Sequence, residues 1–497
     1  MATPLPPNPN LQHLKKQAKA LLRAFRLNEI GVAAKFEALH LKRAPKLSDA
    51  QQLIARDYGF TGWSSLKEHV ESLSSLNEDV LQAAKTAFHN DDASTLSRLF
   101  DRYPGLKARI DEPVGAFDAP LINLVRSREM LDVLLDAGAD INARSRWWAG
   151  GFGLLECASP DVAEHAITRG ADVTVHAAAR LGMLGELKEL VAADPTLVHA
   201  RGGDGQTPLH FASNVDVAEF LLDRGADIDA RDIDHESTPA QYMVRSRQDV
   251  VRFLIRRGCE TDVLMAAAIG DIELIRSKLD ADPDAIRMRV SDEYFPMIDS
   301  GKGGTIYQWE LGWHVSACQV ARSFGYTELF HFLMKRCPAD EKLLNACWIH
   351  DEGLVKSLLD RYPDLVEALP AAGRRQLAHA ARNNDTSAAR LMLAAGLPVA
   401  GTFGQHHATA LHWAAWHGNV QLVRHILRRD PPLEDADNDF KSTPLGWAIH
   451  GSENAWEHKK GEYPATVEQL LDAGAKPPRE LQGTEAVREV LRQRGVG

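Results

Sequence analysis

The chain has 497 residues and a formal charge of −11, from 57 basic and 68 acidic side chains. A negative balance of this size argues against a general binder of nucleic acids or anionic membranes. The five cysteines are an odd number without metal-type spacing, which is typical of reduced thiols. The N-terminus lacks a secretion signal, and no apolar run approaches the roughly 18 residues of a membrane span, so we expect a cytoplasmic protein.

Residues 1–76 predict a small helical cap module. Apolar residues recur at helical spacing from Leu11 to Phe25, and basic residues occupy the opposite face. Three further helical patterns follow, at 29–40, 48–59 and 60–70. Residues 1–50 are rich in lysine and arginine, but no aromatic platform is interleaved with them. We therefore interpret the basic face as a solvated helix surface, with nucleic-acid binding as the weaker alternative.

One stretch, residues 205–231, contains a turn, two short helices and a second turn. Thr207 can cap the first helix, and Pro208 fits its first turn, where no hydrogen-bond donor is lost. Gly225 accepts the left-handed conformation that ends the second helix. A unit of this size cannot bury its own apolar faces, so similar units must be stacked on both sides of it.

This stretch resembles an ankyrin repeat, and its Thr-Pro pair recurs at Thr238 and Thr443 near the period of about 33 residues. The resemblance implies an all-α ankyrin-repeat solenoid of roughly a dozen helix-turn-helix repeats over residues 77–497. The first 76 residues are similar to a helical module that precedes ankyrin arrays in a group of bacterial proteins. A bacterial-type ankyrin-repeat protein is therefore our expectation.

Four insertions interrupt the array, and loops of this kind usually bind something. They lie near residues 144–152, 290–313, 400–407 and 452–464. Residues 305–311, within the second insertion, alternate like a strand. This alternation predicts a β-hairpin that projects from the array and folds over its concave groove.

In ankyrin repeats the two residues after the Ala-Ala pair of the first helix face the concave groove. The resemblance therefore implies groove positions at Arg382 and Asn383, among others, and a groove rich in tryptophan and histidine toward the C-terminus. With the aromatic residues of the insertions, the predicted ligand-binding residues are Trp348, Trp416, His417, His450, Trp456, Tyr307, Trp309 and Trp313. Trp413 and Trp447 take the place of a core leucine, and we assign them to the core.

The main functional hypothesis is a binding protein that recognises a protein, peptide or small molecule in the concave groove of its C-terminal half. No cofactor is implied, and the histidines between 406 and 458 lack metal-site spacing. The alternative is a cofactor-free hydrolase, lyase or isomerase in an aromatic cleft under the hairpin. Its acid/base groups would be His417 or His450, paired with Asp439 or Glu293. The sequence leaves open whether any reaction is catalysed, and what the oligomeric state is.

Overall fold

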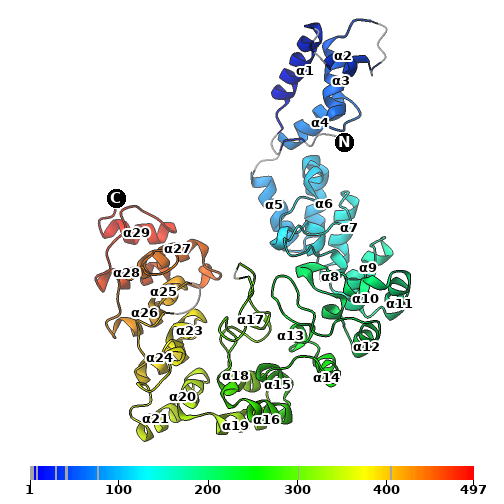
Figure 1. The fold of residues 1–497 in the computed structure, drawn as a ribbon. Helices are drawn as coiled ribbons and strands as arrows, with labels where there is room; N and C mark the ends of the chain where they lie inside the picture. The colour runs from blue at the N-terminus through cyan, green and yellow to red at the C-terminus, as the bar shows by residue number, and fades with distance from the viewer. Residues whose placement is uncertain are drawn as a thin grey trace. The chain divides into compact units, whose positions relative to one another are not determined.

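The computed structural model describes residues 5–6, 9–27, 29, 31–37, 39, 43–74, 78–299, 301–402 and 406–497. Over these ranges the regular structure is helical, no strand is formed, and isolated β-bridges pair Arg144 with Gly153 and Arg289 with Ser316. The predicted all-α class is thereby confirmed. The chain forms two compact units, Met1–Ala226 (unit 1) and Asp227–Gly497 (unit 2) (Figure 1).

Unit 1 begins with four helices that share a core. They are α1 (Leu11–Arg26), α2 (Val32–Glu37), α3 (Leu47–Asp57) and α4 (Trp63–Ser74). Leu14, Phe36 and Leu66 are buried between them. Asn10 caps α1 by accepting a hydrogen bond from the backbone N–H of Gln12, one of the donors that a helix start leaves unpaired. These helices occupy the predicted cap module, whose boundary at residue 76 lies outside the described residues.

The rest of unit 1 consists of short helices, most of which follow one another in pairs. The α-helices are α5 (Glu78–His89), α6 (Ala93–Arg102), α7 (Arg128–Asp136), α8 (Leu154–Cys157), α9 (Pro160–Thr168), α10 (Val175–Leu181), α11 (Leu184–Ala193) and α12 (Val215–Asp223). The 3₁₀ helices are η1 (Pro104–Arg109), η2 (Ala116–Asp118), η3 (Leu121–Leu124), η4 (Pro195–His199), η5 (Gly203–Gly205) and η6 (Pro208–Phe211). Thr207 is the N-cap residue of η6, and Gly225, just after α12, has a φ of 91°. Both features agree with the repeat pattern of residues 205–231.

Unit 2 continues the same pattern. Its helices are α13 (Pro239–Met243), α14 (Gln248–Arg256), α15 (Val263–Ile269), α16 (Ile272–Ala281), α17 (Tyr307–Glu310), α18 (Ala317–Ser323), α19 (Thr327–Arg336), α20 (Ala339–Trp348), α21 (Glu352–Arg361), α22 (Ala371–Arg374), α23 (Gln376–Arg382), α24 (Thr386–Ala395), α25 (Ala410–Trp416), α26 (Val420–Leu427), α27 (Pro444–Asn454), α28 (Tyr463–Asp472) and α29 (Glu485–Gln493). In its C-terminal half, α23, α25 and α27 pack side by side in one row (Figure 1). Helices α24, α26 and α28 form a second row, and the core lies between the two rows.

The predicted β-hairpin in the insertion 290–313 is wrong. The segment expected to be a strand contains the one-turn helix α17, and the other described residues of the insertion form turns and irregular structure. Tyr307 and Leu311, four positions apart, are buried, whereas Trp309 is 71% exposed. Spacing of i and i+4 suits a helical turn, and a run of seven residues is too short for periodicity to separate the two structures.

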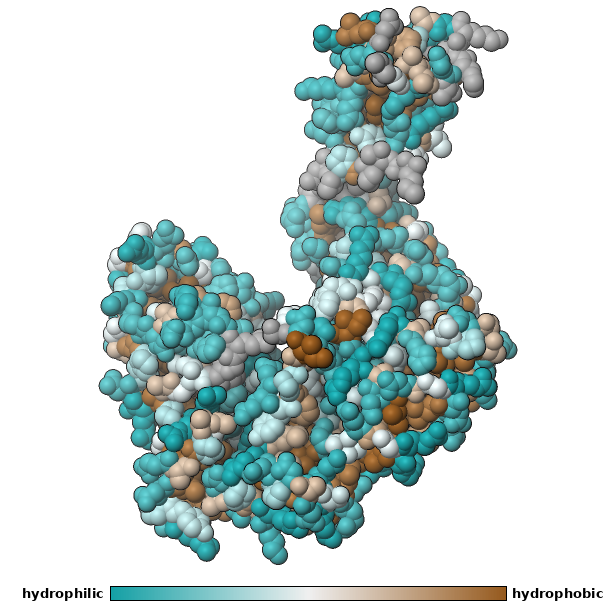
Figure 2. Space-filling model, viewed as in Figure 1, coloured by the Kyte–Doolittle hydropathy of each residue, from teal (hydrophilic) through white to brown (hydrophobic). Residues whose placement is uncertain are grey.

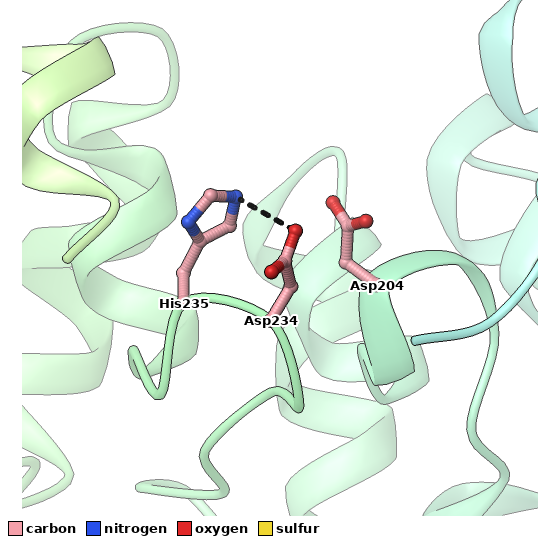
Figure 3. A group of neighbouring side chains, drawn as sticks. All are labelled: Asp204, Asp234 and His235. Atoms are coloured by element: carbon pink, nitrogen blue, oxygen red, sulfur yellow. Dashed lines mark ion pairs between the residues drawn. The ribbon is translucent and has the colours of Figure 1, made fainter. Parts of the chain in front are cut away.

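The loop before α17 is held against residues 234–236. The His235 ring contacts the carbonyl oxygen of Gly304 at 2.8 Å, and a carboxylate oxygen of Asp234 accepts from the backbone N–H of Gly303 at 3.0 Å. Figure 3 shows the ion pair between the two side chains, 3.8 Å from His235 Nε2 to Asp234 Oδ2. Asp204, also labelled in Figure 3, belongs to unit 1, where its backbone N–H donates to the Gly150 carbonyl oxygen. Asp234 and His235 therefore have a structural role in unit 2, because they hold the loop before α17.

The Tyr307 hydroxyl gives a test of how α17 is anchored. It is fully buried and donates to Oδ2 of Asp262 at 2.9 Å, and burial raises the pKa of the Asp262 carboxyl. Tyr307→Phe is expected to lower the free energy of unfolding by about 1–3 kcal/mol, because a buried carboxyl oxygen loses its donor. Urea unfolding of the full chain measures this.

Tyr294→Phe is the matched control for that measurement. The Tyr294 ring is half-buried in the same insertion, and its hydroxyl makes no hydrogen bond to the described residues. We expect this change to stay within about 0.5 kcal/mol of the native chain. Equal losses in the two variants would contradict a specific role for the Tyr307 hydroxyl.

Candidate binding site in the C-terminal half

An aromatic pocket of about 440 Å³ lies in the C-terminal half of unit 2. Its aromatic lining consists of His406, Trp413, Trp416, Phe440, Trp447, His450 and Trp456. On the face shown in Figure 2, hydrophilic residues cover most of the surface and hydrophobic residues are scattered among them. The pocket lining includes four indole rings, those of Trp413, Trp416, Trp447 and Trp456.

Four of these rings lie together because they occupy matching positions in two successive repeats. Trp413 and Trp416 lie three positions apart on α25, and Trp447 and His450 lie three apart on the neighbouring helix α27. Because the two pairs occupy equivalent positions of successive repeats, their side chains meet across the helix contact. Trp413 and Trp447 pack edge to face at 5.1 Å between ring centroids, and Trp416 lies 5.9 Å from His450.

Two loops complete the wall. Phe440, in the turn before α27, lies 5.5 Å from the Trp447 ring and 5.0 Å from His406. Trp456, in the insertion 452–464, lies 6.4 Å from Trp413 and is 67% exposed. Each tilted or edge-to-face contact between aromatic rings contributes about 0.5–1.5 kcal/mol beyond area burial. The rings therefore stabilise one another while part of the aromatic surface stays open to a ligand.

Unit 2 has a second cavity, of about 450 Å³, beneath the insertion 290–313. Its lining mixes apolar residues such as Met265 and Phe295 with the charged groups Arg231, Glu236 and Glu260. All three charged groups are already paired, since Arg231 lies 2.8 Å from Glu260 and Glu236 lies 2.7 Å from Lys302. The aromatic pocket offers the larger continuous apolar surface, and it is our candidate site.

The structure places the predicted site residues in three different settings. Trp416, His450 and Trp456 line the pocket, and His417 lies beside it, 5.9 Å from the Trp456 ring. Trp309 is exposed and lies outside the pocket lining. The expectation that Trp348 faces the groove is wrong, because its ring is 6% exposed and its Nε1–H donates to Gln376 Oε1 at 2.9 Å.

Tyr307 is likewise a core residue rather than a groove residue, and it is fully buried against Asp262. Conversely, Trp413 and Trp447 were assigned to the core and are indeed only 4% and 5% exposed, yet their rings form part of the pocket wall. Phe440 and His406 were missed by the sequence analysis. For Phe440 the sequence offered one signal, an aromatic residue among the polar residues of a turn. The structure shows that this side chain is 59% exposed.

The acid/base pairs expected for an enzyme are not formed among the described residues. His417 contacts the carbonyl oxygen of Arg382 through Nε2 at 2.8 Å, so that nitrogen carries a proton and donates, and burial lowers the pKa of the imidazole. His450 is exposed and contacts Asn454. Asp439 lies 3.6 Å from His406 and 3.3 Å from His407, both at the surface, and Glu293 is exposed.

Arg382, at the end of α23, lies where the two longest insertions meet. Its Cζ is 4.2 Å from the ring centroid of Trp313 in the insertion 290–313, and 5.9 Å from that of Trp456 in the insertion 452–464. The next residue, Asn383, donates to the Trp313 carbonyl oxygen at 2.9 Å. Burial lowers the pKa of the guanidinium to about 10. Two segments about 140 residues apart in sequence thus converge on one cation.

No helix within the described ranges is both long and apolar enough to cross a bilayer. The chain is 51% identical over 49 residues, 9% of its length, to the serine/threonine-protein kinase VIK of Arabidopsis thaliana, covering 11% of that protein. It is 25% identical over 118 residues, 23% of its length, to the ankyrin repeat and SAM domain-containing protein 6 of Mus musculus, covering 13% of it. The chain thus spans little more than a tenth of either relative.

The family model for ankyrin repeats in three copies matches residues 175–265 and 317–437. The matched segments include α23 and α25, which carry Arg382, Trp413 and Trp416, and they end before Phe440. The number of repeats in the whole chain and the bacterial type of the cap module stay predictions. Two segments of this chain, covering α10 to α15 and α18 to α26, are therefore ankyrin repeats.

Proposed function

We propose that this chain is a binding protein that holds an apolar side chain of a partner protein in the aromatic pocket of its C-terminal half. The observation that carries the proposal is the convergence of four tryptophans, from two successive repeats and an insertion, on one cavity of about 440 Å³. Cavities of this size are typical of sites that enclose a small ligand or a single anchoring group.

The ankyrin repeats support a protein partner, since this repeat generally mediates contacts between proteins. Trp456 and Phe440 stand at the rim, 67% and 59% exposed. Aromatic side chains that a partner covers supply most of the binding energy of an interface, and tryptophan is prominent among them. The pocket thus combines a preformed, partly buried floor with two exposed aromatic side chains that a partner can bury.

The enzyme alternative has less support. A general base needs an orienting carboxylate or a substrate proton within hydrogen-bond reach. His417 is hydrogen-bonded to a backbone carbonyl, and His450 contacts only an amide and neighbouring rings among the described residues. A recognition pocket accounts for these residues without any proton transfer.

Trp456→Ala tests the proposal. A library of random dodecapeptides is displayed on phage and selected on the immobilised full chain, and the enriched peptides are synthesised. We expect these peptides to carry an aromatic or branched aliphatic anchor and to bind the variant at least about 30-fold more weakly, the loss typical of an interfacial tryptophan. Thermal stability is expected to stay within about 1 kcal/mol, because the ring is mostly exposed.

Trp309→Ala is the matched control. This ring is 71% exposed, similar to Trp456, but belongs to α17 outside the pocket lining. The selected peptides are expected to bind this variant as tightly as the native chain. Equal affinity for the native chain and Trp456→Ala, or loss of affinity in Trp309→Ala alone, would place the binding surface elsewhere.

A further inference from the structure

We infer that the partner segment carries a carboxylate side chain, Asp or Glu, next to its apolar anchor, and that Arg382 binds this carboxylate. The inference rests on the proposed function, because it concerns the ligand of the same pocket. It assigns a role to a cation that has no ion-pair partner among the described residues and lies at the edge of the aromatic site.

Arg382 lies beside the pocket, outside its lining, and packs against two of the rings that form it. Its Cζ lies 5.7 Å from the ring centroid of Trp413 and 5.9 Å from that of Trp456, and both rings line the cavity. Trp313 packs on the same guanidinium at 4.2 Å. Three indole rings therefore surround the charged group and remove much of its hydration, and this desolvation lowers its pKa.

The guanidinium makes no hydrogen bond and no salt bridge with the described residues. Asp292 is near enough to attract it, but the two do not form an ion pair. Arg289, in the same unit, is the contrasting case, because it is buried and paired with Glu341. The Arg382 side chain is half-buried among the three rings and has no ion-pair partner among the described residues, so an anionic ligand would gain affinity by forming that pair.

Three indole N–H groups around the site also lack an acceptor. The indole Nε1–H groups of Trp313, Trp416 and Trp447 are buried and have no hydrogen-bond partner in the described part of the chain. Indole can only donate. A site with surplus donors and a fixed positive charge favours an acceptor-only, negatively charged group over a hydroxyl or an amine.

The same geometry argues against a cationic ligand, although aromatic walls often bind methylated ammonium groups. Arg382 already occupies the space beside the Trp413 and Trp456 rings and would repel a second positive charge. A carboxylate matches the planar fork of the guanidinium and can accept two hydrogen bonds from it. Because the proposed partner is a protein, the carboxylate belongs to an acidic residue adjacent to the anchor.

Three pools of synthetic decapeptides with degenerate flanks test the inference on the full chain. Their central pairs are Glu-Phe, Gln-Phe and Glu-Ala, so that the first two differ only in charge and the third lacks the anchor. We expect the Glu-Phe pool to bind about 10-fold or more tightly than the Gln-Phe pool, the usual effect of a charge-assisted hydrogen bond. The Glu-Ala pool is expected to bind most weakly.

Arg382→Met and Arg382→Lys are the variants on the protein side. Arg382→Met is expected to abolish the difference between the Glu-Phe and Gln-Phe pools, whereas Arg382→Lys should keep part of it and its salt dependence. The comparison of pools on the native chain stands even if Arg382→Met fails to fold. Arg374→Met is the control, since this side chain is bonded to the Leu369 carbonyl oxygen.

The outcomes separate this inference from the proposed function. If Glu-Phe and Gln-Phe pools bind equally and both lose affinity in Trp456→Ala, the carboxylate inference is overturned and the pocket remains a binding site. If no pool binds the native chain, both ideas fail. Tight binding of 3-phenylpropionate, but of no peptide pool, would overturn the protein source of the carboxylate.

Discussion

Replacing Glu341 with glutamine is expected to lower the free energy of unfolding by about 3–5 kcal/mol, the typical cost of breaking a buried ion pair. The Glu341 carboxylate, on α20, pairs with Arg289, and both side chains are only 4% exposed. It also accepts from Asn345 at 3.3 Å. The substitution leaves Arg289 buried with its charge uncompensated, and Gln319 at 3.2 Å offers only a neutral acceptor.

Two variants make this measurement specific, with urea unfolding of the full chain as the readout. Asp280→Asn breaks a pair with Arg336 in the same unit, but both side chains there are more than 40% exposed, so a change within about 0.5 kcal/mol is expected. The double variant Arg289→Met, Glu341→Met should recover much of the loss, since no charge remains buried. A loss in Asp280→Asn equal to that in Glu341→Gln would refute the role of burial.

The stacking of helices could be predicted from the sequence because repeat signals are local. Thr207 and Thr238 are N-cap residues in the structure, and each precedes a proline in the first turn. Such signals depend on a few neighbouring backbone groups and on no distant contact. The aromatic character of the C-terminal half was visible for a similar reason, since a spacing of 34 residues between Trp413 and Trp447 places both rings at one repeat position.

The insertions were predicted less well because distant contacts determine their conformation. Residues 303–304 are held by Asp234 and His235, and Tyr307 is held by Asp262. These partners lie 45 or more residues away in sequence, and no local pattern specifies them. The alternation of residues 305–311 therefore predicts a strand. The partner of the buried Tyr307 hydroxyl is supplied by the fold and cannot be inferred from neighbouring residues.

The sequence also could not predict which side chains at groove positions are exposed and which are buried. Trp348 and Trp416 occupy equivalent groove positions by the repeat rule, yet Trp348 is covered and hydrogen-bonded to Gln376, whereas Trp416 lines the pocket. The difference arises because His314, directly after the insertion 290–313, is buried there and contacts Gln376 Nε2 at 2.7 Å. The convergence of Trp313 and Trp456 on Arg382 has the same origin and the same absence of a local signal.

A pair of buried histidines next to Trp348 is expected to make unit 2 sensitive to mild acid. The rings of His314 and His379 stack with centroids 3.4 Å apart and an interplanar angle of 3°. The Gln376 amide oxygen accepts from Trp348, so its nitrogen donates to His314 Nε2 at 2.7 Å. That ring nitrogen must therefore be unprotonated. Burial lowers the pKa of both imidazoles well below the ordinary value, and the nearby Arg289 and Arg382 act in the same direction.

His314→Asn isolates the contribution of one ring. His314 has a φ of 60°, a left-handed conformation that asparagine tolerates, so the variant keeps the backbone geometry. Its absolute stability is expected to fall, because a packed ring is lost. The informative quantity is therefore the slope of the free energy of unfolding against pH, compared with that of the native chain under the same conditions.

Because both folded-state pKa values lie below the unfolded value of about 6.5, the unfolded chain binds more protons as the pH falls. The contribution of the two rings to the free energy of unfolding is complete well above pH 6.5 and decreases on acidification, with a slope that approaches about 1.4 kcal/mol per pH unit for each ring well below pH 6.5. Between pH 6.5 and 5.5, urea unfolding of His314→Asn should show a mean slope smaller by about 1 kcal/mol per pH unit. Most carboxyl groups stay ionised in this pH range and therefore add little to the slope. Equal slopes in the two chains would mean that His314 is protonated in the folded state or exposed to water.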